Sequence, residues 1–306
     1  MEKRSLGSLQ VSVVGIGCNN FGARLDLAGT RNVVQGALEA GVNFFDTADI
    51  YGATQSEVLL GQALGGRRGD VVIATKFGMP IDDQRFGAKP DYVKRACEDS
   101  LRRLGTDYID LYQLHYPDAT VPIADTLGAL HELIAKGKVR EIGCSNLTVA
   151  QLKEAKAAAG DANSFVSIQN QYSLLAREPE RDGVLAACDE LDLGFLPFYP
   201  LANGLLTGKV RPGEPLPEGT RLSTMPAERS VHWLSEEFQN RVSALLRYAE
   251  EIEIPILSLA FSWLLSHHQV SSVIAGASSA DQVRANAAAV RQLSPEHIER
   301  LNDLTA

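Results

Sequence analysis

The sequence predicts an α/β fold: a closed (β/α)8 barrel, or TIM barrel, with a β-hairpin before the first barrel strand and an extra helix after the last. Three observations support this prediction. Short apolar segments alternate with amphipathic helical segments along the chain, the apolar segments lack a polar face, and turn residues separate the two kinds. This pattern is typical of parallel strands that are covered by helices and close into a barrel.

Eight apolar segments are expected to form the barrel strands. They span residues 13–18, 42–46, 71–76, 109–115, 139–144, 165–169, 194–199 and 272–275. Ahead of them, residues 3–12 have Leu6 and Leu9 on either side of a Gly-Ser turn. We expect these residues to form a hairpin that plugs the N-terminal end of the barrel.

Helical segments fill the intervals between the strands. Thr30 is expected to cap a helix that ends before Gly41. Other helices are expected at residues 91–104, 123–134, 148–159 and, as the extra C-terminal helix, 294–304. The Pro- and Gly-rich residues 201–230 are expected to form a long loop over a binding site. No change in composition marks a linker, so residues 1–306 are expected to form a single domain.

The composition argues against several classes of protein. A net charge of −9 without a Lys or Arg cluster argues against nucleic-acid binding. The longest apolar stretch, residues 254–265, is shorter than the roughly 20 residues that span a bilayer, and the N-terminus lacks the apolar run of a signal peptide. The scattered cysteines and histidines show no metal-binding spacing, so no metal is expected, and reduced thiols predict a cytoplasmic protein.

Four ionisable side chains follow consecutive predicted strands. Asp46 ends the second strand and Tyr51 lies in the loop after it, Lys76 ends the third strand, and His115 ends the fourth. The active sites of barrels of this kind form where strands end, so these side chains are expected to meet at one rim. Singly, each has a structural explanation, as a cap, a loop anchor, a solvated lysine or a core histidine. Together, on consecutive strand ends, they favour a catalytic site.

This set suits the reduction of a carbonyl group. The oxygen atom needs a proton, and a tyrosine with a pKa near 10 is a reluctant donor. An ammonium group at Lys76 should stabilise the phenolate of Tyr51, and Asp46 can pair with that ammonium group. His115 can orient the substrate oxygen by a hydrogen bond.

The chain also resembles the aldo-keto reductase family. The matching segments are residues 41–52, 56–57 with 60–61, 72–76, 107–115, 138–146, and 200–201 with 204–209. The resemblance implies a reductase of aldehydes or ketones that uses NADPH, and it places the family's catalytic tetrad on Asp46, Tyr51, Lys76 and His115. The implied partner is a small carbonyl compound, and the sequence indicates no particular oligomeric state.

The resemblance also implies a cofactor site. Ser145, Asn146 and Gln169 would hydrogen-bond the nicotinamide carboxamide, and Tyr199 would stack on the ring. The alternative for Gln169 is a solvated strand end. The remaining implied contacts are Asp46, then Leu201, Gly204, Leu205 and Lys209 at the pyrophosphate, and Gly276, Ser278, Gln282 and Asn286 at the adenosine end.

Three glycines lie in or just after the first predicted barrel strand. Gly15 and Gly17 hint at a dinucleotide fingerprint, but Asn20 stands where its third glycine belongs, so we expect them to serve packing. Gly22 is the better candidate for a close approach to the cofactor.

The choice between NADPH and NADH depends on a departure from the family pattern. Many relatives carry a Lys or Arg near positions 278–279 and a Glu where this chain has Ala285. Arg284 is expected to point away. The helix dipole and hydroxyl groups still favour NADPH, and NADH is the alternative.

Phe21, Tyr51, His115 and Tyr116 are expected to contact the substrate, together with the loop 201–230. Two other functions remain as alternatives. One is a nucleotide-binding regulatory subunit, as in relatives that associate with potassium channels. The other is an aldolase or isomerase that forms a Schiff base on Lys76.

Overall fold

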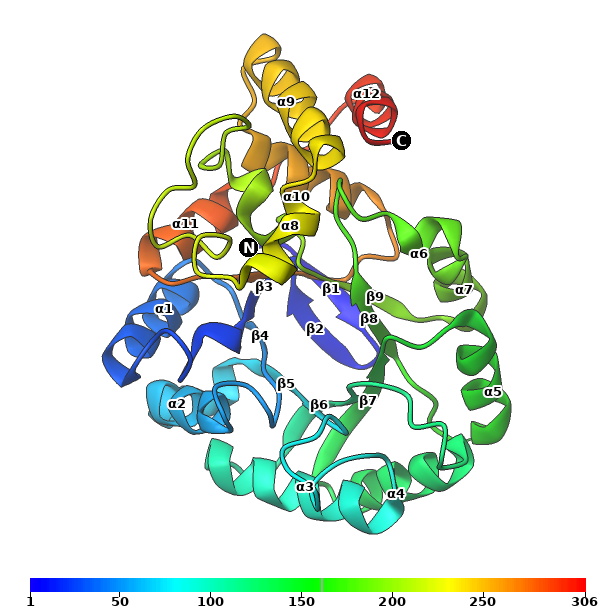
Figure 1. Ribbon diagram of the computed structural model, residues 1–306. Helices are drawn as coiled ribbons and strands as arrows, with labels where there is room; N and C mark the ends of the chain where they lie inside the picture. The colour runs from blue at the N-terminus through cyan, green and yellow to red at the C-terminus, as the bar shows by residue number, and fades with distance from the viewer. Residues whose placement is uncertain (161) are drawn as a thin grey trace.

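Eight parallel strands form the barrel that Figure 1 views along its axis. The computed structural model describes residues 1–160 and 162–306. The strands are β3 (Val14–Gly17), β4 (Phe44–Asp46), β5 (Val72–Phe77), β6 (Ile109–Leu114), β7 (Val139–Ser145), β8 (Ser167–Gln171), β9 (Gly194–Phe198) and β10 (Val273–Gly276). Each overlaps one predicted segment, and the order β10-β3-β4-β5-β6-β7-β8-β9 confirms the barrel.

The barrel closes between β9 and the residues just before β10. The Phe195 N–H donates to the carbonyl oxygen of Gln269 at 2.7 Å, and the Ser271 N–H donates to the carbonyl oxygen of Phe195 at 3.0 Å. These two hydrogen bonds close the barrel in place of a regular strand pairing between β9 and β10. All eight carboxyl ends therefore face one rim, where the predicted polar residues gather.

The N-terminal hairpin consists of β1 (Lys3–Leu6) and β2 (Leu9–Ser12) and crosses one end of the barrel. Leu6 and Leu9 are buried in a cluster with Phe44 and Leu196 of the barrel strands. Gly194 makes room for this plug, because a Cβ atom there would lie 2.3 Å from Cδ1 of Leu6. The predicted plug is confirmed.

Helices surround the strands on the outside of the barrel. They are α1 (Leu27–Glu39), α2 (Gln55–Leu64), α3 (Pro90–Leu104), α4 (Ile123–Ala135), α5 (Val149–Ala159), α6 (Glu178–Arg181), α7 (Val184–Leu191), α10 (Ile256–Ser266) and α11 (Ala280–Ala288). The expected cap at Thr30 is wrong. Asp26 caps α1 by accepting a hydrogen bond from the Gly29 N–H at 2.9 Å, so the helix starts earlier and Thr30 is buried within it.

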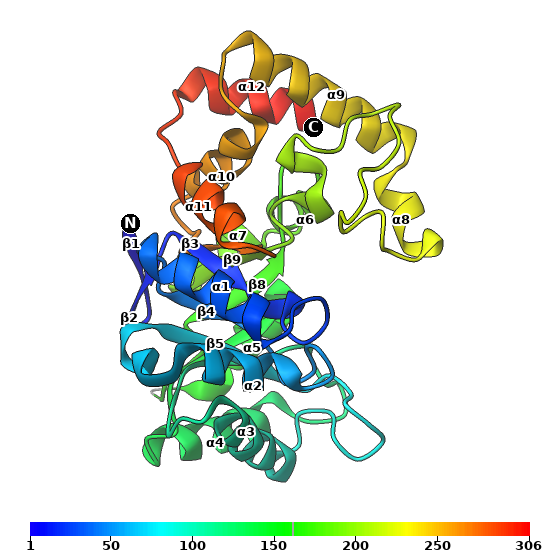
Figure 2. The same cartoon turned by 90° about the vertical axis from the view of Figure 1, so that its left-hand side faces the viewer.

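The long connection between β9 and β10 carries several additional elements. After β9 come the 3-10 helix η3 (Ala202–Thr207), α8 (Ala227–Trp233) and α9 (Glu236–Glu251). Residues 208–226 contain no helix or strand, so most of the predicted loop 201–230 is confirmed, although η3 lies inside it and α8 begins inside it. The terminal helix α12 (Pro295–Thr305) begins after its cap Ser294, as predicted, and packs beside α9 (Figure 2). No helix in the described part of the chain is long and apolar enough to cross a bilayer.

Candidate active site

Asp46 and Lys76 form a buried ion pair at the carboxyl ends of adjacent strands. Nζ of Lys76 lies 2.6 Å from Oδ2 of Asp46 and donates a second hydrogen bond to the Thr47 carbonyl oxygen at 2.8 Å. Burial lowers the pKa of Lys76, but the Asp46 carboxylate and the Tyr51 phenol more than compensate, so this pKa lies above its ordinary value. Lys76 is therefore a fixed ammonium group rather than a free amine.

Tyr51 lies beside this pair, in the loop after β4. Nζ of Lys76 is 5.1 Å from the centroid of the Tyr51 ring. Burial raises the pKa of Tyr51, Lys76 lowers it, and Asp46 raises it, with a net increase. Lys76 therefore stabilises the phenolate, as predicted, but the loss of water around the phenol outweighs this effect on the pKa. The phenol is protonated at neutral pH, as a proton donor must be.

His115 follows β6 and faces Tyr51 edge to face, with 5.9 Å between the ring centroids. Its side chain is buried, and no group in the described chain hydrogen-bonds its Nδ1. Burial lowers the pKa of His115 to about 3, and the charge of Lys76 adds to this effect. The imidazole is therefore neutral at neutral pH and can donate one hydrogen bond to an oxygen atom.

Gln113 is a site residue that the sequence analysis missed. Its Nε2 donates to Oδ1 of Asp46 at 3.2 Å, and Nε2 of Gln169 donates to the same oxygen at 2.9 Å. The sequence could have indicated Gln113, because side chains two residues apart in a strand lie on the same face, and Gln113 precedes His115 by two residues. Both amides hold Asp46 so that its other oxygen, Oδ2, faces Lys76.

The residues expected at the nicotinamide carboxamide lie together on neighbouring strands. Oγ of Ser145 donates to the Gln169 carbonyl oxygen at 2.7 Å. Nδ2 of Asn146 donates to Oγ of Ser145 at 2.9 Å and to the His115 carbonyl oxygen at 3.1 Å. Asn146 has a positive φ of 62°, which is strained for a residue with a side chain. Strain of this kind is found at binding sites, and here it adjoins the tetrad.

Tyr199 follows β9 with a φ of 51° and is 36% exposed. Arg221, from the connection after η3, covers this ring with its guanidinium carbon 5.0 Å from the centroid, and its Nη2 donates to the Tyr199 hydroxyl at 3.2 Å. Arg221 was not predicted, because no periodicity fixes the path of this loop. Nη2 of Arg24, from the segment between η1 (Cys18–Asn20) and α1, donates to the Gly219 carbonyl oxygen at 2.7 Å. The loop is therefore tied at two points.

The residues expected at the pyrophosphate lie in the segment 201–209, after β9. Leu205 is buried, Leu201 is half-buried, and Lys209 is exposed. Gly204 has a φ of 105°, and a Cβ atom there would meet nothing within 4 Å. Gly204 therefore has open space beside its Cα atom, so a ligand could approach the backbone there.

The expected adenosine end lies where β10 leads into α11. Ser279 caps α11, and Ser278 donates to Oε1 of Gln282 from its N–H at 2.9 Å and from its Oγ at 3.2 Å. Gly276 is exposed and Asn286 is buried. Arg284 pairs with Glu39 at 3.1 Å and with Asp281 at 2.8 Å, so its charge is engaged away from Ser278.

The remaining predicted positions divide into buried and exposed residues. Phe21 is fully buried in the hydrophobic core, so its ring offers no surface to a substrate in this structure. Tyr116 is 48% exposed, and its ring stacks on the His115 ring with 5.8 Å between the centroids. At Gly22 a Cβ atom would lie 2.6 Å from Cβ of Gln55, so contact with α2 already requires glycine there. At Gly15 a Cβ atom would lie 2.8 Å from the Phe44 ring, which agrees with a packing role.

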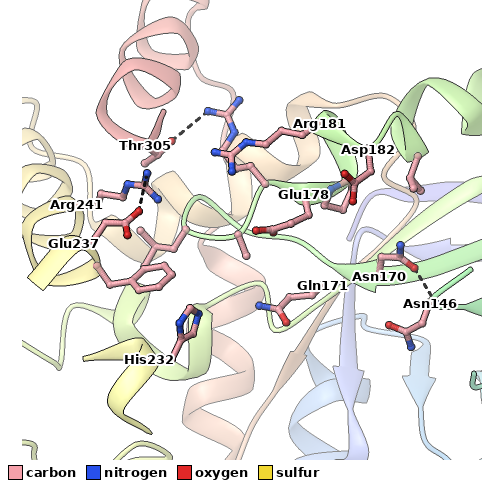
Figure 3. A pocket seen from close by; sticks show the side chains of 16 residues that line it. Asn146, Asn170, Gln171, Glu178, Arg181, Asp182, His232, Glu237, Arg241 and Thr305 are labelled. Atoms are coloured by element: carbon pink, nitrogen blue, oxygen red, sulfur yellow. Dashed lines mark hydrogen bonds and ion pairs between the residues drawn. The ribbon is translucent and has the colours of Figure 1, made fainter. Parts of the chain in front are cut away.

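A polar pocket of about 480 Å³ borders the site at Asn146. Figure 3 shows Asn146 and Asn170 at one end and Arg241 and Thr305 at the other. Its charged residues are Arg177, Glu178, Arg181, Asp182, Glu237 and Arg241, of both signs. The pocket that adjoins the candidate site therefore has no net excess of positive or negative side chains among these residues. No cluster of side chains in residues 1–160 and 162–306 could hold a metal ion.

Comparison with known proteins gives concordant matches over the whole chain. The model of the aldo/keto reductase family matches residues 13–306. The uncharacterized oxidoreductase YqkF of Bacillus subtilis (strain 168) is 36% identical, and the match covers 100% of this chain and 97% of that protein. The solved structure of the aldo-keto reductase AKR11C1 from Bacillus halodurans, in its holo form, is similar with a TM-score of 0.81 and 35% identity, covering 100% and 97%.

Two plant proteins are also similar. A probable voltage-gated potassium channel subunit beta of Arabidopsis thaliana is 34% identical, over 95% of this chain and 91% of that protein. The rice protein of the same description, from Oryza sativa subsp. japonica, is 33% identical, over 98% and 95%.

Proposed function

This chain belongs to the aldo-keto reductase family, and we propose that it reduces aldehydes or ketones with NADPH, using Tyr51 as the proton donor. The main support is the fixed ammonium group of Lys76, 2.6 Å from Asp46 and 5.1 Å from the centroid of the Tyr51 ring. A buried phenol beside a buried cation is suited to release a proton into a site that excludes water.

Each residue of the tetrad has its own role in the proposed reaction. Bound NADPH would supply the hydride for the carbonyl carbon. The Tyr51 hydroxyl donates its proton to the carbonyl oxygen, and Lys76 stabilises the phenolate that is left. Neutral His115 donates a hydrogen bond to the same oxygen and fixes its position. Asp46 keeps Lys76 charged, so the ammonium group is present at each turnover.

The cofactor would lie across the rim from Tyr199 to α11. Its nicotinamide would stack on Tyr199, with Ser145, Asn146 and Gln169 at the carboxamide. For this contact Gln169 would turn its amide from Asp46 to the cofactor. Arg284 is engaged with Glu39 and Asp281, and the N-terminus of α11 and the Ser278 hydroxyl would favour a 2′-phosphate. A helix-dipole contribution of about 0.3–1 kcal/mol corresponds to roughly a two- to fivefold preference for NADPH over NADH.

The test is NADPH consumption with a panel of aldehydes and ketones, repeated with NADH. The wild-type chain should turn over at least one carbonyl class, and Tyr51→Phe should lose nearly all of this activity while it still binds NADPH. Tyr248→Phe is the matched control, because its hydroxyl contacts Nδ1 of His297 on α12 and its own helix, α9, carries none of the proposed site residues. Turnover that is equal in Tyr51→Phe and wild type would refute the proposal.

A second function is a nucleotide-binding regulatory subunit, which the names of the two plant relatives favour. It predicts tight NADPH binding with negligible turnover of every carbonyl tested. The Schiff-base alternative has less support, because Lys76 is a paired ammonium group rather than a nucleophilic amine. We further propose a cytoplasmic location, which agrees with four buried free thiols.

A further inference from the structure

Ser56, in the first turn of α2, contacts the loop after β4 at two points, and the mechanism above does not use it. The side chain is fully buried. Its backbone N–H donates to the Tyr51 carbonyl oxygen at 3.2 Å. Its hydroxyl lies 2.8 Å from Oγ1 of Thr47, and the carbonyl oxygen of Thr47 accepts the hydrogen bond from Nζ of Lys76. Ser56 therefore links the residue that carries the phenol to the residue that holds the ammonium group.

The directions of these hydrogen bonds follow from the number of protons available. The Ser56 hydroxyl has one proton, which it donates to the Cys18 carbonyl oxygen at 2.9 Å. Toward Thr47 the same hydroxyl is an acceptor, so the Thr47 hydroxyl is the donor. The Thr47 backbone N–H donates to the Ala74 carbonyl oxygen of β5 at 2.8 Å. With its hydroxyl and its N–H both engaged, Thr47 is held in the orientation in which its carbonyl oxygen accepts from Lys76.

Glu57 fixes the helix turn from which Ser56 acts. Its buried carboxylate accepts hydrogen bonds from Oγ1 of Thr75 at 2.6 Å and from Nε of Arg103 at 2.6 Å. Thr75 directly precedes Lys76 on β5, and Arg103 lies on α3. Removing a partner from a buried ion pair is costly, so this turn of α2 stays attached to both elements. It is a rigid support for the Ser56 hydroxyl.

The turn between Tyr51 and Ser56 is strained. Ala53 and Thr54 have φ values of 50° and 75°, in the left-handed region that residues with side chains seldom adopt. Such conformations persist where surrounding contacts hold them, and the hydrogen bond from the Ser56 N–H closes this turn. The phenol is therefore carried by a segment whose shape is held from α2.

We propose that Ser56 is a positioning residue whose hydroxyl, through Thr47, keeps the Lys76 ammonium group where it stabilises the phenolate of Tyr51. The inference rests on the proposed roles of Tyr51 and Lys76. Without the Ser56 hydroxyl, the buried hydroxyl of Thr47 loses its acceptor, and Thr47 can turn its carbonyl oxygen away from Nζ of Lys76. Lys76 keeps its bond to Asp46 but is held less firmly. The hydride and proton transfer should slow about three- to tenfold, as expected for the loss of one hydrogen bond.

The first experiment measures single-turnover oxidation of NADPH by wild type and Ser56→Ala over a range of carbonyl concentrations. The rate at saturating carbonyl should fall by that factor. The half-saturating carbonyl concentration and the Kd for NADPH should change by less than about twofold, because the buried Ser56 side chain offers no surface to either ligand.

Ser262→Ala on α10 is the matched control. Ser262 is also a buried serine, its Oγ accepts a hydrogen bond from the Arg291 N–H at 3.0 Å, and α10 carries none of the proposed site residues. This variant should oxidise NADPH at the wild-type rate. An unchanged rate in Ser56→Ala, or an equal loss in Ser262→Ala, would overturn the inference.

A double-mutant cycle tests whether Ser56 acts through Thr47. Thr47→Val keeps the shape of the side chain and removes the hydroxyl. If the two hydroxyls act through one hydrogen bond, the double variant should be slower than the slower single variant by no more than about twofold. Losses that multiply in the double variant would mean that the two residues act independently, which contradicts the proposed path.

A measurement without turnover keeps this inference separate from the proposed function. In a chain with 15N-labelled lysine, the Nζ signal of Lys76 is identified by its loss from Lys76→Met. This signal should shift in Ser56→Ala and in Thr47→Val and should stay in place in Ser262→Ala. An unmoved signal in the first two variants would exclude the role of Ser56 even in an active reductase. If the signal moves in a chain that reduces no carbonyl, the reductase proposal fails and the placement of Lys76 by Ser56 stands.

Discussion

Replacing His115 by glutamine should change how stability depends on pH. Burial lowers the pKa of His115 to about 3, whereas in the unfolded chain this pKa is about 6.5. Between these values the unfolded state binds a proton that the folded state does not. The stability that depends on a neutral His115 is therefore complete above pH 6.5 and is lost as the pH falls toward 3.

The magnitude follows from the two pKa values. At pH 8, protonation of the His115 imidazole changes the free energy of unfolding by almost nothing. At pH 5, proton binding to this imidazole favours the unfolded chain roughly 30-fold, which corresponds to about 2 kcal/mol. His115→Gln removes this contribution because its side chain does not titrate. The free energy of unfolding of the variant, relative to wild type, should therefore rise by about 2 kcal/mol between pH 8 and pH 5.

The assay is urea denaturation at both pH values, monitored by tryptophan fluorescence, for wild type and His115→Gln. His131→Gln is the control, because His131 is partly exposed and its Nε2 contacts the Asn163 carbonyl oxygen. Parallel pH dependences for wild type and His115→Gln would show that the imidazole protonates normally in the folded state. The assignment of a neutral hydrogen-bond donor to position 115 would then be wrong.

Three further changes should have measurable effects. Asp46→Asn leaves the buried ammonium group of Lys76 without its carboxylate and should lower the free energy of unfolding by about 3–5 kcal/mol in urea denaturation. Gly22→Ala places a Cβ atom against Gln55 in a left-handed conformation and should cost about 1–3 kcal/mol in the same assay. Arg221→Ala removes the cover from the proposed nicotinamide platform and should speed NADPH release several-fold in stopped-flow fluorescence, by about 1 kcal/mol of lost cation–π contact.

Each of these changes has a result that would count against it. Asp46→Asn with unchanged stability would mean that Lys76 is neutral or solvated. Gly65→Ala is the control for Gly22, since Gly65 also has a positive φ but a Cβ atom there meets nothing within 4 Å, so it should cost less. Unchanged NADPH release from Arg221→Ala would mean that the loop is held elsewhere.

The fold was predictable because its signals are local. Eight apolar segments with helices between them specify strands and their order, and the barrel follows from the parallel topology. The cap at Thr30 was mispredicted because Asp26 offers an equally good capping group one turn earlier. Local sequence cannot decide between two such residues.

The site residues at strand ends were predictable, because adjacent strands bring their side chains together. The properties that depend on burial, and the contacts that depend on the path of a loop, were less predictable. The positions of Asp46 and Lys76 follow from adjacent strands, and their contact was expected. The raised pKa of Tyr51 depends on how much water the folded chain excludes, which no motif encodes. Arg221 reaches Tyr199 through a segment without periodicity, so only the folded structure reveals their contact.

The most direct test of the central claim is a single-turnover measurement of NADPH oxidation by wild type and Lys76→Met with a saturating carbonyl substrate. Lys76 is proposed to stabilise the phenolate of Tyr51 as the proton leaves. The account predicts that Lys76→Met binds NADPH but oxidises it at least about 100-fold more slowly, the size typical of lost acid catalysis. Oxidation at the wild-type rate by a folded Lys76→Met variant would contradict the account.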